Sequence, residues 1–368
     1  MLRILGLGLG ATLLASTAMA QSRWDGADEL AVSPLACGAG GAAAAAAKPY
    51  DGGQPTGAPD RAGKPLTVVD VPKLIGIGYF NATSKGMQDA AKELGNVTVT
   101  TDGPTKANID EQITFIDNYV TRGVDGILFA ANDPVAIAPV LKKALEKGIN
   151  VVGYDANSTP DARQWFVNQA EFNGIGKALV DQMAAEIGQD GAFAIVTSTF
   201  TTPNQARWIA EMQAYQEACY PNMKWLETVE AQEDNILSFN QASTLINKYG
   251  DELKGIFGMT SVATPASAEA VTQAGQCGKI AVVGLATPNA MKPYVEKDCV
   301  KSVVLWNPVD LGYAATFVLR AVADGKLQPG ATEVEAGKLG KLQVVNGSEI
   351  LLGPPFVFSK ANIGEFDF

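Results

Sequence analysis

The pattern of apolar and polar positions divides the chain into a short apolar leader, a segment of small residues and a long alternating body. From residue 66 onward, short apolar or β-branched runs alternate with helix-length segments that carry the amphipathic helical period. The runs predicted as strands are 66–71, 97–100, 126–129, 150–154, 192–197, 224–229, 255–258, 280–285 and 302–306. The segments predicted as helices are 85–94, 109–121, 136–147, 175–187, 203–218, 238–249 and 266–274.

This alternation of strands and helices predicts parallel sheets covered by helices on both faces. A single sheet of this size would be unusual, whereas two sheets of about five strands each match common sheet and domain sizes. The natural break lies near Asn168. We therefore expect an α/β fold with two Rossmann-like lobes and a ligand cleft between them, lined by the loops that leave the carboxyl ends of the strands.

The residues before the body predict export. A basic start at Arg3, an apolar run over 4–15 and a small-x-small site at 18–20 are typical of a cleaved signal peptide over 1–20. The apolar run is shorter than the about 20 residues that span a bilayer, so we expect an exported protein that is soluble outside the cytoplasm, without direct membrane insertion. Residues 21–63 are rich in Gly, Ala and Pro and are interpreted as a linker with ordered ends, or alternatively as a spacer near a membrane partner.

Composition excludes several classes of function. The formal net charge is −11, so the chain lacks the excess of basic residues that nucleic acids require, and we expect no nucleic-acid partner. The sequence contains no histidine, which excludes His-based nucleophile triads and the commonest zinc sites. We expect no catalytic residues, no metal and no cofactor.

Polar and aromatic residues follow the predicted strands, where the cleft would lie. The candidate ligand-binding residues are Lys73, Tyr79, Phe80, Asp133, Asp155, Asn204, Gln205, Thr260, Ser261, Trp306 and Asn307. Further polar residues at the same ends are Asn132, Asn157, Thr287, Asn289 and Asp310. Carboxylates and amides pair with hydroxyl groups, and aromatic faces cover the C–H surface of a sugar ring. This set of residues predicts a site for a neutral polyhydroxylated ligand.

The residues alone leave structural alternatives open. Asp155 is also suited to capping the segment that follows it. Asn204 follows Pro203, which is typical of a first helical turn. Lys73 is also compatible with a solvated strand end, and the aromatic candidates with places in the core.

Six strings occur in order along the body and carry a family resemblance. They are VPKLIGIGYF (71–80), DGPT (102–105), NQARWIAEM (204–212), ATPNAMKPYVE (286–296), LWNPVDLGY (305–313) and PPFVFSKANIGEFDF (354–368). With these strings the chain resembles, from about Leu66 to Phe368, the periplasmic binding proteins of sugar ABC transporters that have the ribose-binding fold. Within that family it is similar to the rhamnose-binding and autoinducer-2-binding subgroup.

The resemblance implies a type I fold with three crossings between the lobes. It assigns 64–168 plus 308–345 to the N-terminal lobe and 169–307 plus 346–368 to the C-terminal lobe. It also implies that Lys73, Asp155, Asn204 and Gln205 face the ligand. Asn204 is typical of the rhamnose-like group, because the autoinducer-2 group has Asp at this position, and Met259 departs from the proline of both groups.

The implied function is that of a monomeric solute-binding component of a sugar ABC importer, which closes around L-rhamnose or a related deoxy sugar or polyol and presents it to a membrane permease. An alternative is a protein that senses autoinducer-2. An exported carbohydrate-active enzyme is disfavoured, because it would need paired carboxylates such as Asp133 and Asp155, and amide-rich walls suit binding better.

The cysteines are expected to form one disulfide. Cys277 and Cys299 each precede a strand, and the resembling fold places these strands side by side in the same direction. Neighbouring strands lie about 4.8 Å apart and disulfides join Cα atoms about 4.4–6.8 Å apart, so we expect a bond, with two free thiols as the alternative. For Cys37 and Cys219 we expect no fixed pairing.

Overall fold

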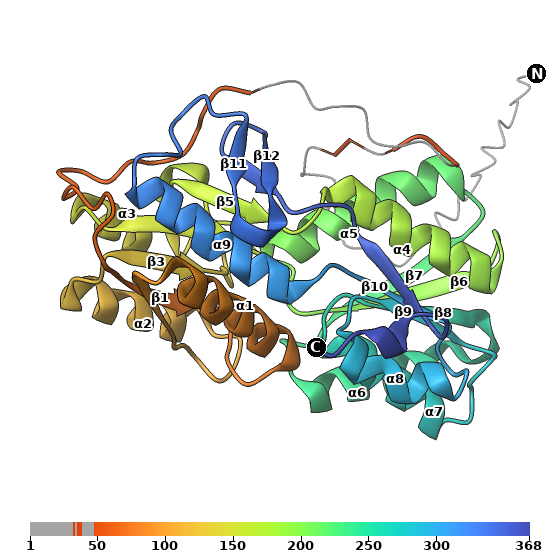
Figure 1. The fold of residues 1–368 in the computed structure, drawn as a ribbon. Coiled ribbons are helices and arrows are strands. Elements are labelled where there is room, and N and C mark those ends of the chain that lie inside the picture. Colours follow the sequence, from red (N-terminus) through yellow and green to blue (C-terminus); the bar gives the residue numbers. More distant parts are fainter. Residues whose placement is uncertain (1–31, 34, 39–47) are drawn as a thin grey trace, which may run out of the picture.

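The structure, a computed structural model, describes residues 32–33, 35–38 and 48–368. The predicted signal peptide over 1–20 lies outside the described residues. The body forms two α/β lobes, each built on its own sheet (Figure 1). No helix within the described residues is both long and apolar enough to cross a membrane.

The N-terminal lobe contains an eight-stranded sheet in the order β11-β12-β13-β5-β4-β3-β1-β2. Its strands are β1 (Leu66–Val71), β2 (Val97–Thr101), β3 (Gly126–Phe129), β4 (Asn150–Tyr154), β5 (Trp165–Asn168), β11 (Glu333–Glu335), β12 (Lys341–Val345) and β13 (Glu349–Leu351). Its helices are α1 (Gly78–Leu94), α2 (Ile109–Arg122), α3 (Ala138–Glu146) and α9 (Pro308–Ala323). The pairs among β1 to β5 are parallel, as is β13 with β5, whereas β12 pairs antiparallel with both of its neighbours.

Alternate residues of the central strands enter two separate cores. Val68 of β1 and Leu128 of β3 belong to the core beneath α1 and α9. Val69 and Ile127, their neighbours in sequence, belong to the core beneath α2 and α3. Because side chains alternate between the two faces of a sheet and both faces are covered, these strands are apolar throughout, which is why the sequence pattern revealed them.

The C-terminal lobe contains a four-stranded parallel sheet in the order β7-β6-β8-β9. Its strands are β6 (Ala192–Thr197), β7 (Lys224–Glu230), β8 (Leu253–Gly258) and β9 (Ala281–Gly284), with the antiparallel pair β10 (Ser302–Leu305) and β14 (Phe356–Ser359) beside them. Its helices are α4 (Phe172–Ile187), α5 (Pro203–Cys219), α6 (Asn235–Tyr249), α7 (Ala263–Gln273) and α8 (Pro288–Glu296). Single 3₁₀ turns occupy Pro160–Ala162, Gly250–Glu252, Gly337–Leu339 and Ile363–Glu365.

All the predicted strands and helices are present, with some ends shifted by a few residues. The sequence pattern did not identify β5, α8, α9 or the strands β11 to β14. The missed strands are only three to five residues long, which is too short for an alternation to stand out. Helix α8 contains Pro293 within its span, which hides the helical period.

The chain passes between the lobes after β5, between β10 and α9, and between β13 and β14. The third passage corrects the expected boundary at residue 345, because β13 pairs with β5 in the sheet of the N-terminal lobe. A tight turn joins β12 to β13, and its Asn346 and Gly347 have φ values of 49° and 88°. An Asn-Gly pair between two apolar runs is a strong hairpin signal. From this pair, β13 could have been predicted as the partner strand of β12.

Two described parts of the predicted linker pack on different lobes. In the N-terminal lobe, the Tyr50 ring lies 5.1 Å from the Trp165 ring, centroid to centroid, and Arg61 forms an ion pair of 3.1 Å with Asp125. In the C-terminal lobe, the Ser33 amide donates to the buried Glu211 carboxylate on α5 (3.2 Å). The expectation of an ordered end is therefore met by 48–63, whereas the other end, 21–31, lies outside the described residues.

The structure contains two disulfides. Cys277 and Cys299 are bonded, with Cα atoms 4.7 Å apart, and the strands that follow them meet in the parallel bridge Leu285–Val304. The expectation for the other two cysteines was wrong, because Cys37 is bonded to Cys219 with Cα atoms 5.4 Å apart. Packing of the segment around Ser33 on α4 and α5 brings Cys37 to the end of α5, a long-range contact that no local pattern encodes.

Candidate ligand-binding site

A cavity lies between the lobes, at the carboxyl ends of the strands of both sheets. The space left free between its side chains is about 30 Å³, so the two lobes are drawn together and the lining residues define the site. Its lining residues are Lys73, Ile77, Tyr79, Phe80, Asp155, Asn204, Gln205, Trp208, Glu233, Met259, Thr260, Ser261, Leu285, Leu305 and Trp306.

All but two of the candidate residues line this cavity; the exceptions are Asp133 and Asn307. Asp133 Oδ1 accepts hydrogen bonds from the amides of Val135 (2.9 Å) and Ala136 (2.8 Å), so its carboxylate stabilises a turn before α3. Asn307 is the N-cap of α9 and accepts from the Val309 amide (2.9 Å). Hydrogen bonds from nearby backbone amides, a common role of Asp and Asn, explain both positions.

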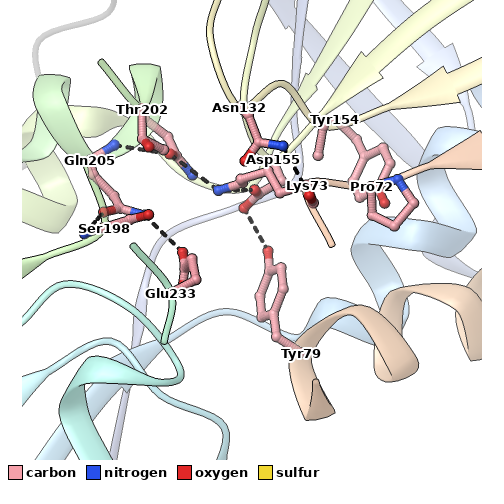
Figure 2. Close-up of polar contacts among 12 residues, drawn as sticks. Pro72, Lys73, Tyr79, Asn132, Tyr154, Asp155, Ser198, Thr202, Gln205 and Glu233 are labelled. Carbon is pink, nitrogen blue, oxygen red and sulfur yellow. Dashed lines mark hydrogen bonds and ion pairs between the residues drawn. The ribbon is translucent and has the colours of Figure 1, made fainter. Parts of the chain in front are cut away.

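The N-terminal lobe contributes a buried ion pair. Lys73 Nζ lies 2.9 Å from Asp155 Oδ2, and the two side chains are only 5% and 3% exposed (Figure 2). Tyr79 Oη donates to Asp155 Oδ1 (2.9 Å) and accepts from Trp306 Nε1 of the C-terminal lobe (2.9 Å). Burial and the adjacent carboxylate hold the pKa of Tyr79 well above its ordinary value, so its hydroxyl stays protonated and remains a donor.

The backbone turns sharply to present Asp155. Its φ is 58°, in the left-handed region that non-glycine residues seldom occupy. Tyr154 ends β4 and is fully buried, and the Ala156 amide donates to Tyr154 O at 2.5 Å, which closes a tight turn around Asp155. Strained backbone of this kind is concentrated at functional sites, and it supports ligand binding by Asp155 over a purely structural role.

The C-terminal lobe contributes amides from the first turn of α5. Asn204 Oδ1 lies 3.4 Å from Lys73 Nζ, a hydrogen bond that joins the two lobes. Gln205 Oε1 accepts from Thr197 Oγ1 (2.7 Å) and from the Ser198 amide (2.8 Å). These contacts orient the Gln205 side chain so that its Nε2 donates to Glu233 Oε1 (3.2 Å; Figure 2).

Some of the residues that line the cavity were not predicted from the sequence. Trp208 lies four residues after Asn204 on α5, so the helical period could have placed it on the same face. Glu233 gave no such signal, because it lies among acidic and polar residues that are typical of an exposed loop. The other missed residues are Ile77, Leu285 and Leu305, and Met259 was noted only as a departure from the family.

The remaining walls are aromatic and aliphatic. The rings of Trp208 and Trp306 lie 5.6 Å apart, and those of Tyr79 and Trp306 lie 6.1 Å apart at 90°. The cavity is therefore polar along Lys73, Asp155, the α5 amides, Glu233, Thr260 and Ser261, and apolar along its aromatic and aliphatic residues. Among residues 32–33, 35–38 and 48–368, no cluster of His, Cys, Asp and Glu side chains is arranged to hold a metal ion.

Comparisons with known proteins agree with this architecture. The family model described as periplasmic binding protein domain matches residues 68–327. The D-allose-binding periplasmic protein of Escherichia coli (strain K12) is 24% identical over 261 residues, covering 67% of this chain and 81% of that protein.

Solved structures match over most of both chains. An ABC transporter solute-binding protein from Clostridium phytofermentans with bound L-rhamnose is 28% identical, with a TM-score of 0.76 over 82% of this chain and 98% of that chain. LsrB from Clostridium saccharobutylicum in complex with AI-2 is 22% identical, with a TM-score of 0.78 over 82% and 100% of the two chains. The matched family model spans most of both lobes, and this chain belongs to the periplasmic binding protein family, with its type I fold.

Proposed function

We propose that this protein is the periplasmic solute-binding component of a sugar ABC importer. It acts as a monomer, binds a monosaccharide between lobes 64–168 plus 308–351 and 169–307 plus 352–368, and delivers it to a membrane permease. The observation that carries the proposal is the closed cavity in which buried polar groups of both lobes, such as Asp155 and Asn204, face one another. Related proteins that bind D-allose and L-rhamnose support it.

The two-sided character of the cavity favours a deoxy sugar, with L-rhamnose as the first candidate. Lys73, Asp155 and Asn204 supply acceptors and donors for adjacent hydroxyls along one side. Ile77, Leu285 and other aliphatic residues offer no hydrogen-bond partner, and an unmatched buried hydroxyl costs about 1–3 kcal/mol. A methyl group suits this side better than a hydroxymethyl group.

Sensing of autoinducer-2 is a second candidate, supported by the similar fold of the AI-2 complex. Asn204 argues against it, because the resembling autoinducer-2 proteins have Asp at this position. An enzymatic function has less support, since the Asp133 carboxylate is engaged by backbone amides and lies outside the cavity. A carboxylate pair of the kind that glycosidases use is therefore not assembled from Asp133 and Asp155.

Titration calorimetry of the purified protein tests the proposal. The panel contains L-rhamnose, D-allose, D-ribose, D-arabinose, D-fucose and AI-2. We expect the 6-deoxy sugars L-rhamnose and D-fucose to bind more tightly than D-allose, because a methyl group leaves no hydroxyl against the aliphatic wall. Of the two, we expect L-rhamnose to bind more tightly, because Asn204 is typical of the rhamnose-like group. Preferential binding of AI-2 would support the second candidate, and no binding of any compound would refute the proposal.

Binding should be accompanied by closure of the lobes. The cavity residues Lys73, Gln205 and Trp306 are at most 4% exposed, so a ligand enters only when the lobes separate. We expect small-angle X-ray scattering to give a smaller radius of gyration with saturating sugar than without it. Superimposable scattering curves would contradict the closure mechanism.

A further inference from the structure

Glu233 reaches the cavity from a constrained turn between β7 and α6. Gln232 and Glu233 have φ values of 52° and 54°, so two consecutive non-glycine residues are left-handed. The amides of Ala231 and Gln232 hold the turn by donating to Ser198 O at 3.1 and 2.9 Å. The turn lies beside the first residues after β6, and it directs the Glu233 side chain to Gln205 (Figure 2).

The Glu233 carboxylate is only half satisfied. Oε1 accepts from Gln205 Nε2 at 3.2 Å, whereas Oε2 is buried and has no hydrogen-bond partner. Buried polar atoms are nearly always paired, so an unpaired one that faces a binding cavity indicates a partner supplied by the ligand. Burial raises the pKa of Glu233, against the opposing effects of the Lys73 ammonium and of the nearby Thr260 and Gln205 side chains.

Glu233 also differs from Asp155 in its electrostatic environment. The Asp155 carboxylate forms an ion pair with Lys73 at 2.9 Å and accepts from the Tyr79 hydroxyl. These two contacts balance its charge and hold its orientation before a ligand binds. Glu233 forms no ion pair with a lysine or arginine of the described residues. Its unpaired oxygen belongs to the C-terminal lobe, beside Gln205, whereas Asp155 belongs to the N-terminal lobe, so the two carboxylates reach the cavity from different lobes.

We propose that Glu233 is a specificity-determining residue, whose Oε2 accepts a hydrogen bond from one particular hydroxyl of the sugar. The inference rests on the proposed function and deepens it. The ligand class becomes a monosaccharide with hydroxyls on two edges, one facing Asp155 and Asn204 and the other facing Glu233. A sugar without the second hydroxyl would leave Oε2 unpaired and would be rejected on closure.

The experiment compares wild type with Glu233→Gln and Glu233→Ala by calorimetry. The probes are the tightest-binding monosaccharide of the panel and its complete set of monodeoxy analogues. We expect at least tenfold weaker binding of the parent sugar by both variants. We also expect wild type to bind one monodeoxy analogue at least tenfold more weakly than the parent sugar. Glu233→Gln should bind this same analogue as tightly as wild type does, because the hydroxyl that Glu233 would bind is already absent. The hydroxyl missing from that analogue is the one that Glu233 binds.

Controls separate this role from a structural one. Gln232→Asn changes an exposed side chain in the same turn and introduces asparagine, which adopts the left-handed backbone readily. The affinity of this variant for the parent sugar should therefore equal that of wild type. If the Glu233 variants weakened the parent and every analogue by the same factor, Glu233 would be a structural residue and the inference would be wrong. Unchanged affinity in both Glu233 variants would also overturn it, whereas failure of wild type to bind any sugar would refute the proposed function itself.

Discussion

Replacement of Asp155 by alanine is expected to weaken sugar binding at least a hundredfold, and also to lower the free energy of unfolding by about 3–5 kcal/mol. The second effect arises because Lys73 and Asp155 form a pair that is 5% and 3% exposed, and removing one partner leaves the other charge buried without compensation. The Tyr79 hydroxyl also loses its acceptor. Calorimetry measures the first effect and urea denaturation the second.

Two further variants separate binding from stability. In Lys73→Met/Asp155→Leu both charges are replaced by apolar groups, which is often neutral for stability, so we expect the unfolding free energy to recover while sugar binding stays lost. Asn204→Ala removes an uncharged amide and should weaken binding about tenfold, or about 1.4 kcal/mol, with little change in stability. Wild-type affinity in Asp155→Ala would show that the sugar binds elsewhere.

The sequence was most informative where the physical constraint is local or repeated. Residues such as Val68 and Val69 enter opposite cores, so the central strands are apolar throughout and could be recognised from composition alone. The carboxyl ends of those strands located Lys73, Asp155 and the start of α5, because the topology of parallel sheets directs these ends toward the ligand. The family resemblance then distinguished cleft residues from caps.

The remainder depended on contacts between distant segments. Glu233 resembles an exposed acidic residue, and only the left-handed turn over 232–233 brings it to Gln205. Asp133 and Asp155 have the same chemistry after neighbouring strands, yet backbone amides engage Asp133 while Asp155 faces Lys73. Whether such a carboxylate faces the cavity or a nearby turn depends on the direction of its side chain, which residue type and spacing do not specify.

The unexpected disulfide is expected to contribute more stability than the predicted one. Cys37 and Cys219 are separated by 182 residues and Cys277 and Cys299 by 22, so opening the first bond releases a much longer loop in the unfolded chain. In the chain-entropy model the losses are about 5 and about 3 kcal/mol, respectively. The longer loop also includes residues 48–63, which pack on the N-terminal lobe, so the Cys37–Cys219 bond encloses parts of both lobes.

We therefore expect Cys37→Ser/Cys219→Ser to lose more stability in urea denaturation than Cys277→Ser/Cys299→Ser, measured under identical oxidising conditions. Both double variants should retain sugar affinity, because neither bond contributes a residue to the cavity. Equal losses, or a larger loss in the Cys277 and Cys299 variant, would contradict the loop-length argument. That result would mean that strain or residual structure in the unfolded chain, rather than loop closure, determines what these bonds contribute.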